Sequence, residues 1–164
     1  MTLSFKTEIK GNPTHFVEQI HHCLFALLEP EVQYPYWREV NKKGFDTEKA
    51  KGRKKKHTIR TDSKNRWEAG KNIHFVINNR TPQRFQFAPV VICKSVQLIA
   101  IYQNIDSAGF QIANPSVHID NRNLTPVEIE NLAINDGFDS AEDFFAYFNK
   151  DSTGKIIHWT NLKY

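Results

Sequence analysis

Residues 52–60 of this 164-residue chain read GRKKKHTIR, a basic run that leads directly into a short alternating segment. Successive side chains of a β-strand point to opposite faces. If Ile59 packs inward, Thr58 and Arg60 share the other face, and His57 lies on the face of Ile59. A hydroxyl beside a guanidinium offers a donor or a nucleophile next to an anion-binding group. The segment therefore predicts a strand that forms one wall of a polar site.

A threonine hydroxyl in such a site is a weak nucleophile and needs a neighbouring base. Lys55 or Lys56 is a candidate for that base, provided that burial or nearby cations lower its pKa. Because Lys55 lies three residues before Thr58, the two side chains diverge in a straight strand. We therefore expect the chain to bend before His57 if Lys55 is to meet Thr58.

The basic run belongs to a segment that holds half of the positive charge of the chain. Residues 42–66 contain 11 of the 22 lysines and arginines and three of the 18 acidic residues. The segment has a net charge of +8, against +4 for the whole chain, so the remainder has −4. Such clusters are typical of surfaces that bind phosphate groups, which makes RNA an expected partner. A solvated loop without a partner is the alternative.

Several basic residues and one aromatic residue are candidates for ligand binding. Trp37 lies in an aromatic segment that adjoins the basic run, where it can stack on a base. The candidate ligand-binding residues are Arg53, Lys54, Lys56, Arg60, Arg66 and Trp37. His21-His22-Cys23 suggests a metal site, but adjacent side chains on a helix point about 100° apart. We expect neither a metal nor another cofactor.

Length and composition favour a single globular domain, which we assign to residues 1–164. Apolar residues make up 40% and charged residues 24% of the chain, as in ordinary globular proteins. The apolar runs are too short or too interrupted to span a membrane, and the N-terminal residues do not resemble an export signal. Cys23 and Cys93 lie in apolar contexts, which is typical of reduced core cysteines. We expect a cytoplasmic protein without a membrane partner.

Hydrophobic periodicity predicts an α+β fold, a small mixed β-barrel with a few packed helices. The stretch of about residues 30–51 shows no clear period and is interpreted as an insertion, with a short helix around Asp46–Lys51. Thr125 and Glu128 form a capping box at the start of a helix that should end at Gly137. Strands are expected at residues 3–9, 57–61, 72–77, 90–102 (as one bent strand or two), 111–112, 117–120 and 155–164, and further helices after Asn12-Pro13 and after Ser140.

Four short motifs occur in a characteristic order. They are Gly52-Arg53-Lys54 with Lys55 three residues before Thr58-Ile59-Arg60, then Trp67-x-x-Gly70, then Leu132-Ala133-x-x-Asp136-Gly137-Phe138, and finally Ile157-His158-Trp159-Thr160. In this order and spacing the chain resembles the ASCH domains, a branch of the PUA-like fold. The resemblance covers the start of the chain and about residues 52–164, and it leaves the insertion unmatched.

The resemblance implies a compact PUA-like barrel whose cleft, lined by the Thr-Ile-Arg strand, binds RNA or nucleoside-like ligands. One small amidohydrolase of this family, which acts on an acylated cytosine nucleoside, uses a lysine, a threonine and a glutamate there. By resemblance, these catalytic positions fall on Lys55, Thr58 and, one methylene shorter, Asp136. Arg60 would then bind or polarise the substrate. The structural alternatives are that Asp136 only closes a helix and that Thr58 is an ordinary strand residue.

Three functional hypotheses follow for this chain. The first is a module that binds RNA or a nucleotide or nucleoside in a basic cleft. The second is an amidohydrolase that acts on an acylated cytosine nucleoside. The third is an accessory domain that docks another protein through its aromatic insertion. The sequence leaves the ligand, the choice between RNA and a free nucleoside, and the oligomeric state open.

Overall fold

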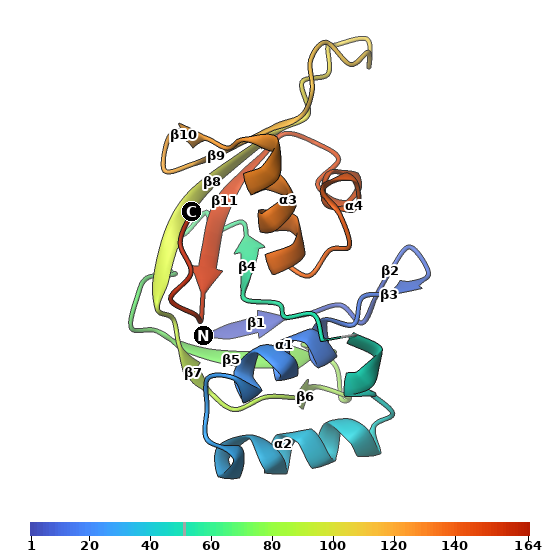
Figure 1. The fold of residues 1–164 in the computed structure, drawn as a ribbon, viewed down its shortest axis with the longest axis vertical. Coiled ribbons are helices and arrows are strands. Elements are labelled where there is room, and N and C mark those ends of the chain that lie inside the picture. The colour runs from blue at the N-terminus through green and yellow to red at the C-terminus, as the bar shows by residue number, and fades with distance from the viewer. Residues whose placement is uncertain (51) are drawn as a thin grey trace.

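The structure is a computed structural model that describes residues 1–50 and 52–164, and it has the predicted α+β class (Figure 1). The described residues contain four α-helices and several sheets. Hydrogen bonding leaves these sheets separate, so none of them closes into a barrel within the described residues. No helix in these two ranges is both long and apolar enough to cross a membrane.

The largest sheet has five antiparallel strands and carries the last four residues of the GRKKKHTIR segment, His57–Arg60, on one edge. Its strands, in spatial order, are β10 (Arg122–Asn123), β9 (Ser116–Ile119), β8 (Ser95–Tyr102), β11 (Ser152–His158) and β4 (His57–Arg60). β11 lies between β8 and β4, so Ile157 faces Thr58 in the register of one pair and Val96 in that of the other. The strand predicted from residues 57–61 is therefore an edge strand beside the closing strand.

A second sheet is organised around β5 (Asn72–Ile77), whose bounds are those expected from the sequence. β1 (Thr2–Ser4) pairs with it in parallel, and β6 (Phe85–Gln86) pairs with it in antiparallel orientation. β7 (Val91–Ile92) pairs with the other end of β5. A separate hairpin consists of β2 (Glu8–Ile9) and β3 (Asn12–Pro13). β1 brings the start of the chain against the middle of the sequence.

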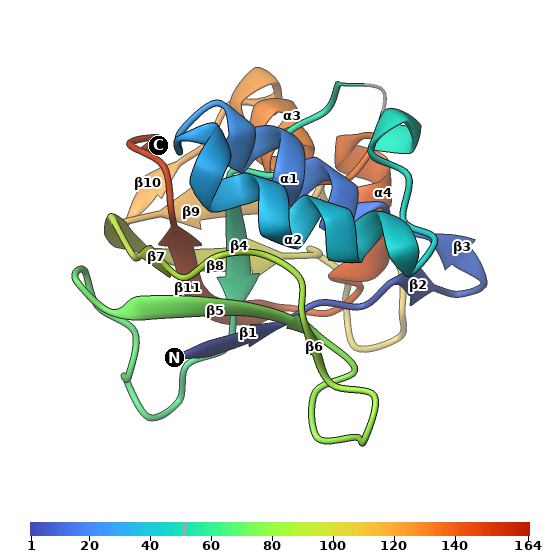
Figure 2. The same cartoon turned by 90° about the horizontal axis from the view of Figure 1, so that it is seen from below.

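Helices cover one face of each main sheet (Figures 1 and 2). α1 (Phe16–Phe25) and α2 (Pro30–Lys42) lie over the β1–β5 sheet, whereas α3 (Pro126–Asn135) and α4 (Ala141–Tyr147) pack beside the five-stranded sheet. The buried apolar residues divide in the same way, with one cluster around Phe75 and the other around Phe144. Cys23 and Cys93 are buried and free, in agreement with the sequence-based expectation.

Residues 30–42 form a regular helix, so the expectation of an irregular segment was wrong. Pro30 occupies the first turn of α2, where a proline is tolerated, although Pro35 lies inside the helix. Gln33 and Val40 are the only described residues of α2 that are fully buried. Of these two inward positions only Val40 is apolar, so the helix has no continuous apolar stripe, which hid the helical period. The short helix predicted near residue 46 is a 3-10 helix, η1 (Thr47–Ala50), and Lys51 lies outside the described residues.

Other element boundaries also differ from the expected ones. Asn12–Pro13 belongs to β3 instead of capping a helix, and α1 begins after His15, whose φ is 52°. The stretch 90–102 forms two strands, β7 and β8, which is one of the two expected arrangements, because its first part pairs with β5 and its second part with β11. Gln111 forms only an isolated bridge, to Ile105. The closing strand runs from Ser152 to His158, and the last residues fold back along the sheet instead of extending it.

Candidate functional site

The chain bends immediately before β4, and this bend turns the Lys55 side chain inward. The backbone N–H of Lys55 donates to the carbonyl of Gln19 in α1, at 3.3 Å. The next N–H, that of Lys56, donates to the carbonyl of Asn135 at the end of α3, at 2.8 Å. The segment is therefore held between two helices. It has the bend that was expected if Lys55 is to approach the Thr58 strand.

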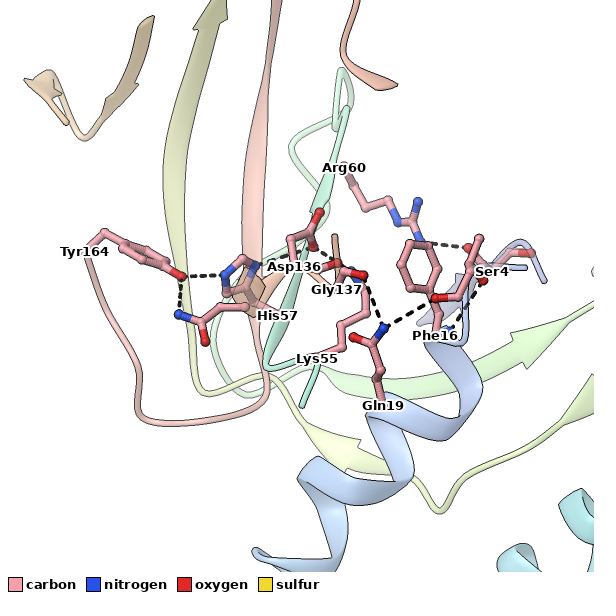
Figure 3. Close-up of polar contacts among 11 residues, drawn as sticks. Ser4, Phe16, Gln19, Lys55, His57, Arg60, Asp136, Gly137 and Tyr164 are labelled. Atoms are coloured by element: carbon pink, nitrogen blue, oxygen red, sulfur yellow. Dashed lines mark hydrogen bonds and ion pairs between the residues drawn. The ribbon is translucent and has the colours of Figure 1, made fainter. Parts of the chain in front are cut away.

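Lys55 and Asp136 form a buried ion pair at the centre of the site (Figure 3). The Nζ atom of Lys55 lies 2.7 Å from Oδ1 of Asp136 and also donates to the Asp136 backbone carbonyl. It lies 4.5 Å from the centre of the Phe16 ring, within the range of a cation–π contact. The side chains of Lys55 and Asp136 are 1% and 5% exposed. Each charge is therefore stabilised by the other rather than by water.

Asp136 is the residue that follows α3, and the local sequence fixes it there. The capping box of Thr125 and Glu128 starts α3, and the predicted Gly137 turn ends it, with φ at +92°. The Gly137 carbonyl accepts a hydrogen bond of 3.2 Å from Nε2 of Gln19. The end of α3 is thus tied to α1, which brings the Asp136 carboxylate over Lys55.

Burial and pairing act in opposite directions on these two groups. Burial lowers the pKa of Lys55 from 10.5 to about 8, although Asp136 partly opposes the shift. Burial alone would raise the pKa of Asp136, but Lys55 and His57 outweigh it and hold that pKa below its ordinary value. At neutral pH the carboxylate is ionised. Lys55 is mostly charged, but it loses its proton far more easily than a lysine in water does.

His57 approaches the same carboxylate from the start of β4. Its Nδ1 lies 3.5 Å from Oδ1 of Asp136, and its Nε2 lies 2.7 Å from the hydroxyl oxygen of Tyr164. Nδ2 of Asn135 donates to the same hydroxyl, at 3.1 Å. The His57 side chain is 0% exposed, and burial lowers its pKa although Asp136 opposes the shift. His57 is therefore neutral at physiological pH.

Arg60 lies at the other end of β4. One guanidinium nitrogen donates to the Ser4 carbonyl at 2.7 Å, and the guanidinium lies 5.1 Å from the centre of the Phe5 ring. Burial lowers the pKa of Arg60, and the more distant Asp136 partly opposes this shift. Within residues 1–50 and 52–164, no carboxylate lies within ion-pair distance of its guanidinium. Arg60 thus keeps hydrogen-bonding capacity for an anionic or carbonyl group.

A cavity of about 490 Å³ lies between the two main sheets, and Lys55, Thr58, Arg60 and Asp136 all line it. Strands β4, β8 and β11 contribute to its walls, as do the residues that follow β1 and those around α4. Five aromatic rings also line it, those of Phe5, Phe16, Phe138, Tyr147 and Phe148. The cavity combines charged groups, a hydroxyl and flat apolar surfaces.

The remaining predicted ligand-binding residues lie outside this cavity. Arg53 pairs with Asp139, and Lys54 and Arg66 are exposed. Lys56 is half-buried and its backbone is engaged with the end of α3. Trp37 lies on α2, where its ring contacts that of Tyr34 with a centroid distance of 5.6 Å. The structure therefore brings together the three predicted catalytic residues and Arg60, but not the other basic residues or Trp37.

Sequence reasoning missed several residues of the site. Tyr164 and Gln19 gave no local signal, because their partners lie far away in the sequence. His57 was placed on the face of Ile59 and was given no role. Phe138 was named only as the last residue of the Asp136-Gly137-Phe138 motif and was given no role, and it lines the cavity. An aromatic residue directly after a helix-ending glycine was the one signal available for it.

The described residues show no group of three or more histidine, cysteine, aspartate or glutamate side chains placed to hold a metal ion. The two adjacent histidines of α1 diverge, as expected from helix geometry. Nε2 of His21 lies 2.7 Å from the Phe87 carbonyl, and Nε2 of His22 lies 2.8 Å from the Thr47 carbonyl. Both rings have a structural role.

The site can hold a planar, polar small molecule and can move a proton near neutral pH. Lys55 supplies a buried amine with a lowered pKa, Thr58 a hydroxyl, and Arg60 a guanidinium. Comparison of the chain with protein-family models, with curated proteins and with solved structures found no match.

Proposed function

We propose that this chain is an ASCH-like domain that binds a nucleotide or nucleoside in the cavity between its two main sheets. One observation carries the proposal: Lys55, Thr58, Arg60 and Asp136 line a single cavity together with five aromatic rings. Its volume of about 490 Å³ lies in the range of about 300–1,000 Å³ that is usual for small-molecule sites.

The chemistry of the cavity walls matches the parts of a nucleoside. Aromatic rings such as Phe138 and Tyr147 offer flat surfaces on which a base can stack. Arg60 can donate two hydrogen bonds to a carbonyl or phosphate oxygen. Lys6, which also lines the cavity, adds a second positive charge for a phosphate. Thr58 can donate to or accept from a polar edge of the base.

The PUA-like barrel is part of this proposal. Strands β4, β8 and β11 of one sheet line this cavity, and so does Ser4 at the end of β1 in the other sheet. An open or partly closed barrel has this arrangement, in which two sheets contribute to the wall of one cavity. Under this interpretation, α2 and η1 form the insertion at about residues 30–51.

The direct test is calorimetric titration with cytidine, cytidine monophosphate and a short single-stranded RNA. We expect saturable binding of at least one of them, and we expect Arg60→Ala to weaken it by about 10–100-fold, because hydrogen bonds to a charged group contribute about 1.5–3 kcal/mol. Lys54→Ala is the matched control, since Lys54 is exposed and lies outside the cavity. Absence of binding to all three probes at millimolar concentration would refute the proposal.

A second candidate function, amidohydrolysis, is favoured by the lowered pKa of Lys55, about 8. In this reaction neutral Lys55 accepts the Thr58 hydroxyl proton while the Thr58 oxygen attacks the acyl carbonyl of an acylated cytosine. The exocyclic amine leaves with the proton from Lys55. Water then hydrolyses the acyl-threonine ester, which releases the carboxylic acid and restores both residues. Asp136 holds Lys55 in place throughout.

Chromatography of acetylcytidine incubated with the protein tests this reaction. The expected products are cytidine and acetate, at a rate that rises with pH up to about 8 as Lys55 loses its proton. Thr58→Val keeps the shape of the side chain and removes the hydroxyl, so it should abolish turnover. Turnover that survives Thr58→Val would eliminate Thr58 as the nucleophile, and unchanged acetylcytidine would leave binding as the function.

A further inference from the structure

The Asp136 carboxylate has a second contact that the proposed reaction does not use. His57 lies between Asp136 and Tyr164, with 3.5 Å from its Nδ1 to Oδ1 of Asp136 and 2.7 Å from its Nε2 to the Tyr164 hydroxyl (Figure 3). The ring is completely buried. A buried polar ring held at both ends has a defined orientation, and a defined proton position follows from its partners.

The hydrogen-bond donors in this chain can be assigned from the chemistry of its members. Burial raises the pKa of Tyr164, so its hydroxyl keeps its proton. Asn135 donates to the hydroxyl oxygen, which leaves the hydroxyl proton for Nε2 of His57. A neutral imidazole whose Nε2 accepts a hydrogen bond must carry its proton on Nδ1. That N–H faces the Asp136 carboxylate at 3.5 Å, which is an ion-pair contact and too long for a normal hydrogen bond.

We propose that His57 and Tyr164 are positioning residues, which together hold the Asp136 carboxylate in the orientation that pairs with Lys55. The Tyr164 hydroxyl and the Asp136 carboxylate favour the same tautomer of His57, whose Nδ1 faces Oδ1 of Asp136, the oxygen that Lys55 also contacts. The inference rests on the proposed function only for its effect on ligand binding. The hydrogen-bond chain itself is a property of the free protein.

Several charged or titratable groups surround the carboxylate and have to be considered with it. Lys55 and the more distant Arg60 lie on the side of the cavity. The ring of His158 in β11 packs on that of His57, with a centroid distance of 5.3 Å. Burial lowers the pKa of His158 to about 3, so this ring is neutral and brings no charge. Lys55, which precedes β4, faces the carboxylate as a charged donor. Within β4, His57 is the group that faces the carboxylate.

Nitrogen NMR of the histidine rings in the free protein tests the first step of the chain. We expect His57 to be the Nδ1–H tautomer in the unmodified protein and to remain neutral well below pH 6.5. In Tyr164→Phe the Nε2 atom loses its hydrogen-bond donor, so its nitrogen resonance should move, while the Asp136 carboxylate still favours a proton on Nδ1. Tyr102→Phe is the matched control, because that tyrosine contacts His118 and not His57. An Nε2–H tautomer in the unmodified protein would overturn the inference.

The second step is tested at His57 with a pair of substitutions. His57→Leu fills the space but cannot donate, whereas the side-chain amide of His57→Asn has an N–H close to the position of Nδ1. Carbon NMR of the Asp136 carboxyl should show a pKa that rises in His57→Leu and stays low in His57→Asn. Equal values in the two variants would mean that His57 only fills space. If His57→Leu does not fold, the comparison of His57→Asn with the unmodified protein and the Tyr164→Phe result decide the question.

Ligand titrations over a range of pH connect the chain to the site. In a variant with a raised Asp136 pKa, ligand binding should already be lost at a higher pH as the solution is acidified. His57→Leu should therefore lose binding at a higher pH than His57→Asn. A normal hydrogen-bond chain in a protein that binds no nucleoside or nucleotide would refute the proposed function and leave this inference standing. Nucleoside binding together with an Asp136 pKa that is the same in His57→Leu as in the unmodified protein would refute this inference and leave the proposed function standing.

Discussion

The Lys55–Asp136 pair concentrates two opposite charges where water is excluded. Pairs of this kind contribute little net stability, because the loss of hydration offsets most of the attraction. The lowered pKa of Lys55 agrees with this, since the ammonium is less favourable here than in water even with Asp136 beside it. The pair is thus better explained by the chemistry of the cavity than by the stability of the fold.

Replacing one partner of this pair should be much worse than replacing both. Lys55→Met leaves a buried carboxylate without its partner and should lower the free energy of unfolding by about 3–5 kcal/mol. The double variant Lys55→Met, Asp136→Leu should recover most of that loss. Urea unfolding at pH 7 measures both, with Lys42→Met as the control, because Lys42 forms an exposed pair with Glu39. A double variant less stable than Lys55→Met would contradict the argument.

Buried neutral histidines should make the fold sensitive to acid. Burial lowers the pKa of His158 from 6.5 to about 3 and that of His21 from 6.5 to about 4. Above pH 6.5 both are neutral in the folded and unfolded chain, so stability is complete there. Below it only the unfolded chain takes up protons, and each histidine lowers the free energy of unfolding by about 1.4 kcal/mol per pH unit until its folded pKa is reached.

The His158→Leu variant isolates one of these contributions. Neither ring nitrogen of His158 has a hydrogen-bond partner within the described residues, so an apolar side chain should be tolerated at pH 7. Urea unfolding between pH 7 and pH 4 should give a smaller loss of stability in the variant than in the unmodified protein. An equal loss of stability in the variant and in the unmodified protein would show that His158 also takes up a proton in the folded state over this pH range.

At the residue scale, the sequence identified the part of the site that a motif could carry. Thr58 and Lys55 were selected by their chemistry and by resemblance, Asp136 was selected by resemblance alone, and all three line one cavity. Their supporting residues could not be selected in this way. Tyr164 reaches His57 across 107 positions of the chain, and no periodicity or capping rule reports a contact over that separation.

Among the elements, the turn after α3 is the one on which the site depends most. Gly137 has φ at +92°, and a Cβ there would lie 2.9 Å from Oε1 of Gln19 and 2.9 Å from the Phe16 ring. A side chain at this position would therefore push α1 and the end of α3 apart. Asp136 and Lys55 would separate with them.

Gly137→Ala and Gly11→Ala form a matched pair for this effect. Gly11 has a similar φ of +83°, but nothing lies within 4 Å of its Cβ position. Gly11→Ala should lower the free energy of unfolding by about 1–2 kcal/mol through backbone strain alone. Gly137→Ala should lower the free energy of unfolding by a further amount of about 1–3 kcal/mol, which is the usual effect of overpacking. It should also weaken ligand binding. Equal losses in thermal unfolding would show that the contact with α1 is dispensable.

Elements with their own end signals were predicted well, and elements defined by tertiary contacts were not. The capping box and glycine of α3 and the serine cap of α4 are read from a few adjacent residues. α2 has only two buried positions, so its helical period was too weak to detect. The sequence left open whether residues 90–102 form one strand or two, because the division into β7 and β8 follows from pairing with two different sheets.

On the scale of the whole molecule, the basic segment is not a single surface. Its members include Lys55 in the buried pair, Arg60 at the cavity and Arg53 in an ion pair with Asp139. The remaining charge is spread over α2, η1 and two loops. The exposed members with described positions are Lys42, Lys43, Lys49, Lys54, Lys64 and Arg66.

Salt dependence should therefore distinguish a cavity ligand from an RNA strand. Binding of an uncharged nucleoside in the cavity should change by less than about twofold between 50 and 500 mM salt. A single-stranded RNA held by the exposed lysines should lose about fivefold in affinity for each phosphate contacted over the same range. Calorimetry of cytidine and of a short RNA at both salt concentrations measures this. A steep salt dependence for cytidine would contradict binding in the cavity.

The cavity is assembled from segments that are distant in the chain, from Ser4 to Gly154. β1 pairs with β5, and β4 pairs with β11 near the other end of the sequence. Contacts over such separations close large loops and slow the folding of small domains. The binding site can therefore exist only after the last strand has docked. During refolding, the appearance of ligand binding would report completion of the fold, later than signals from helices such as α3 that form from local contacts.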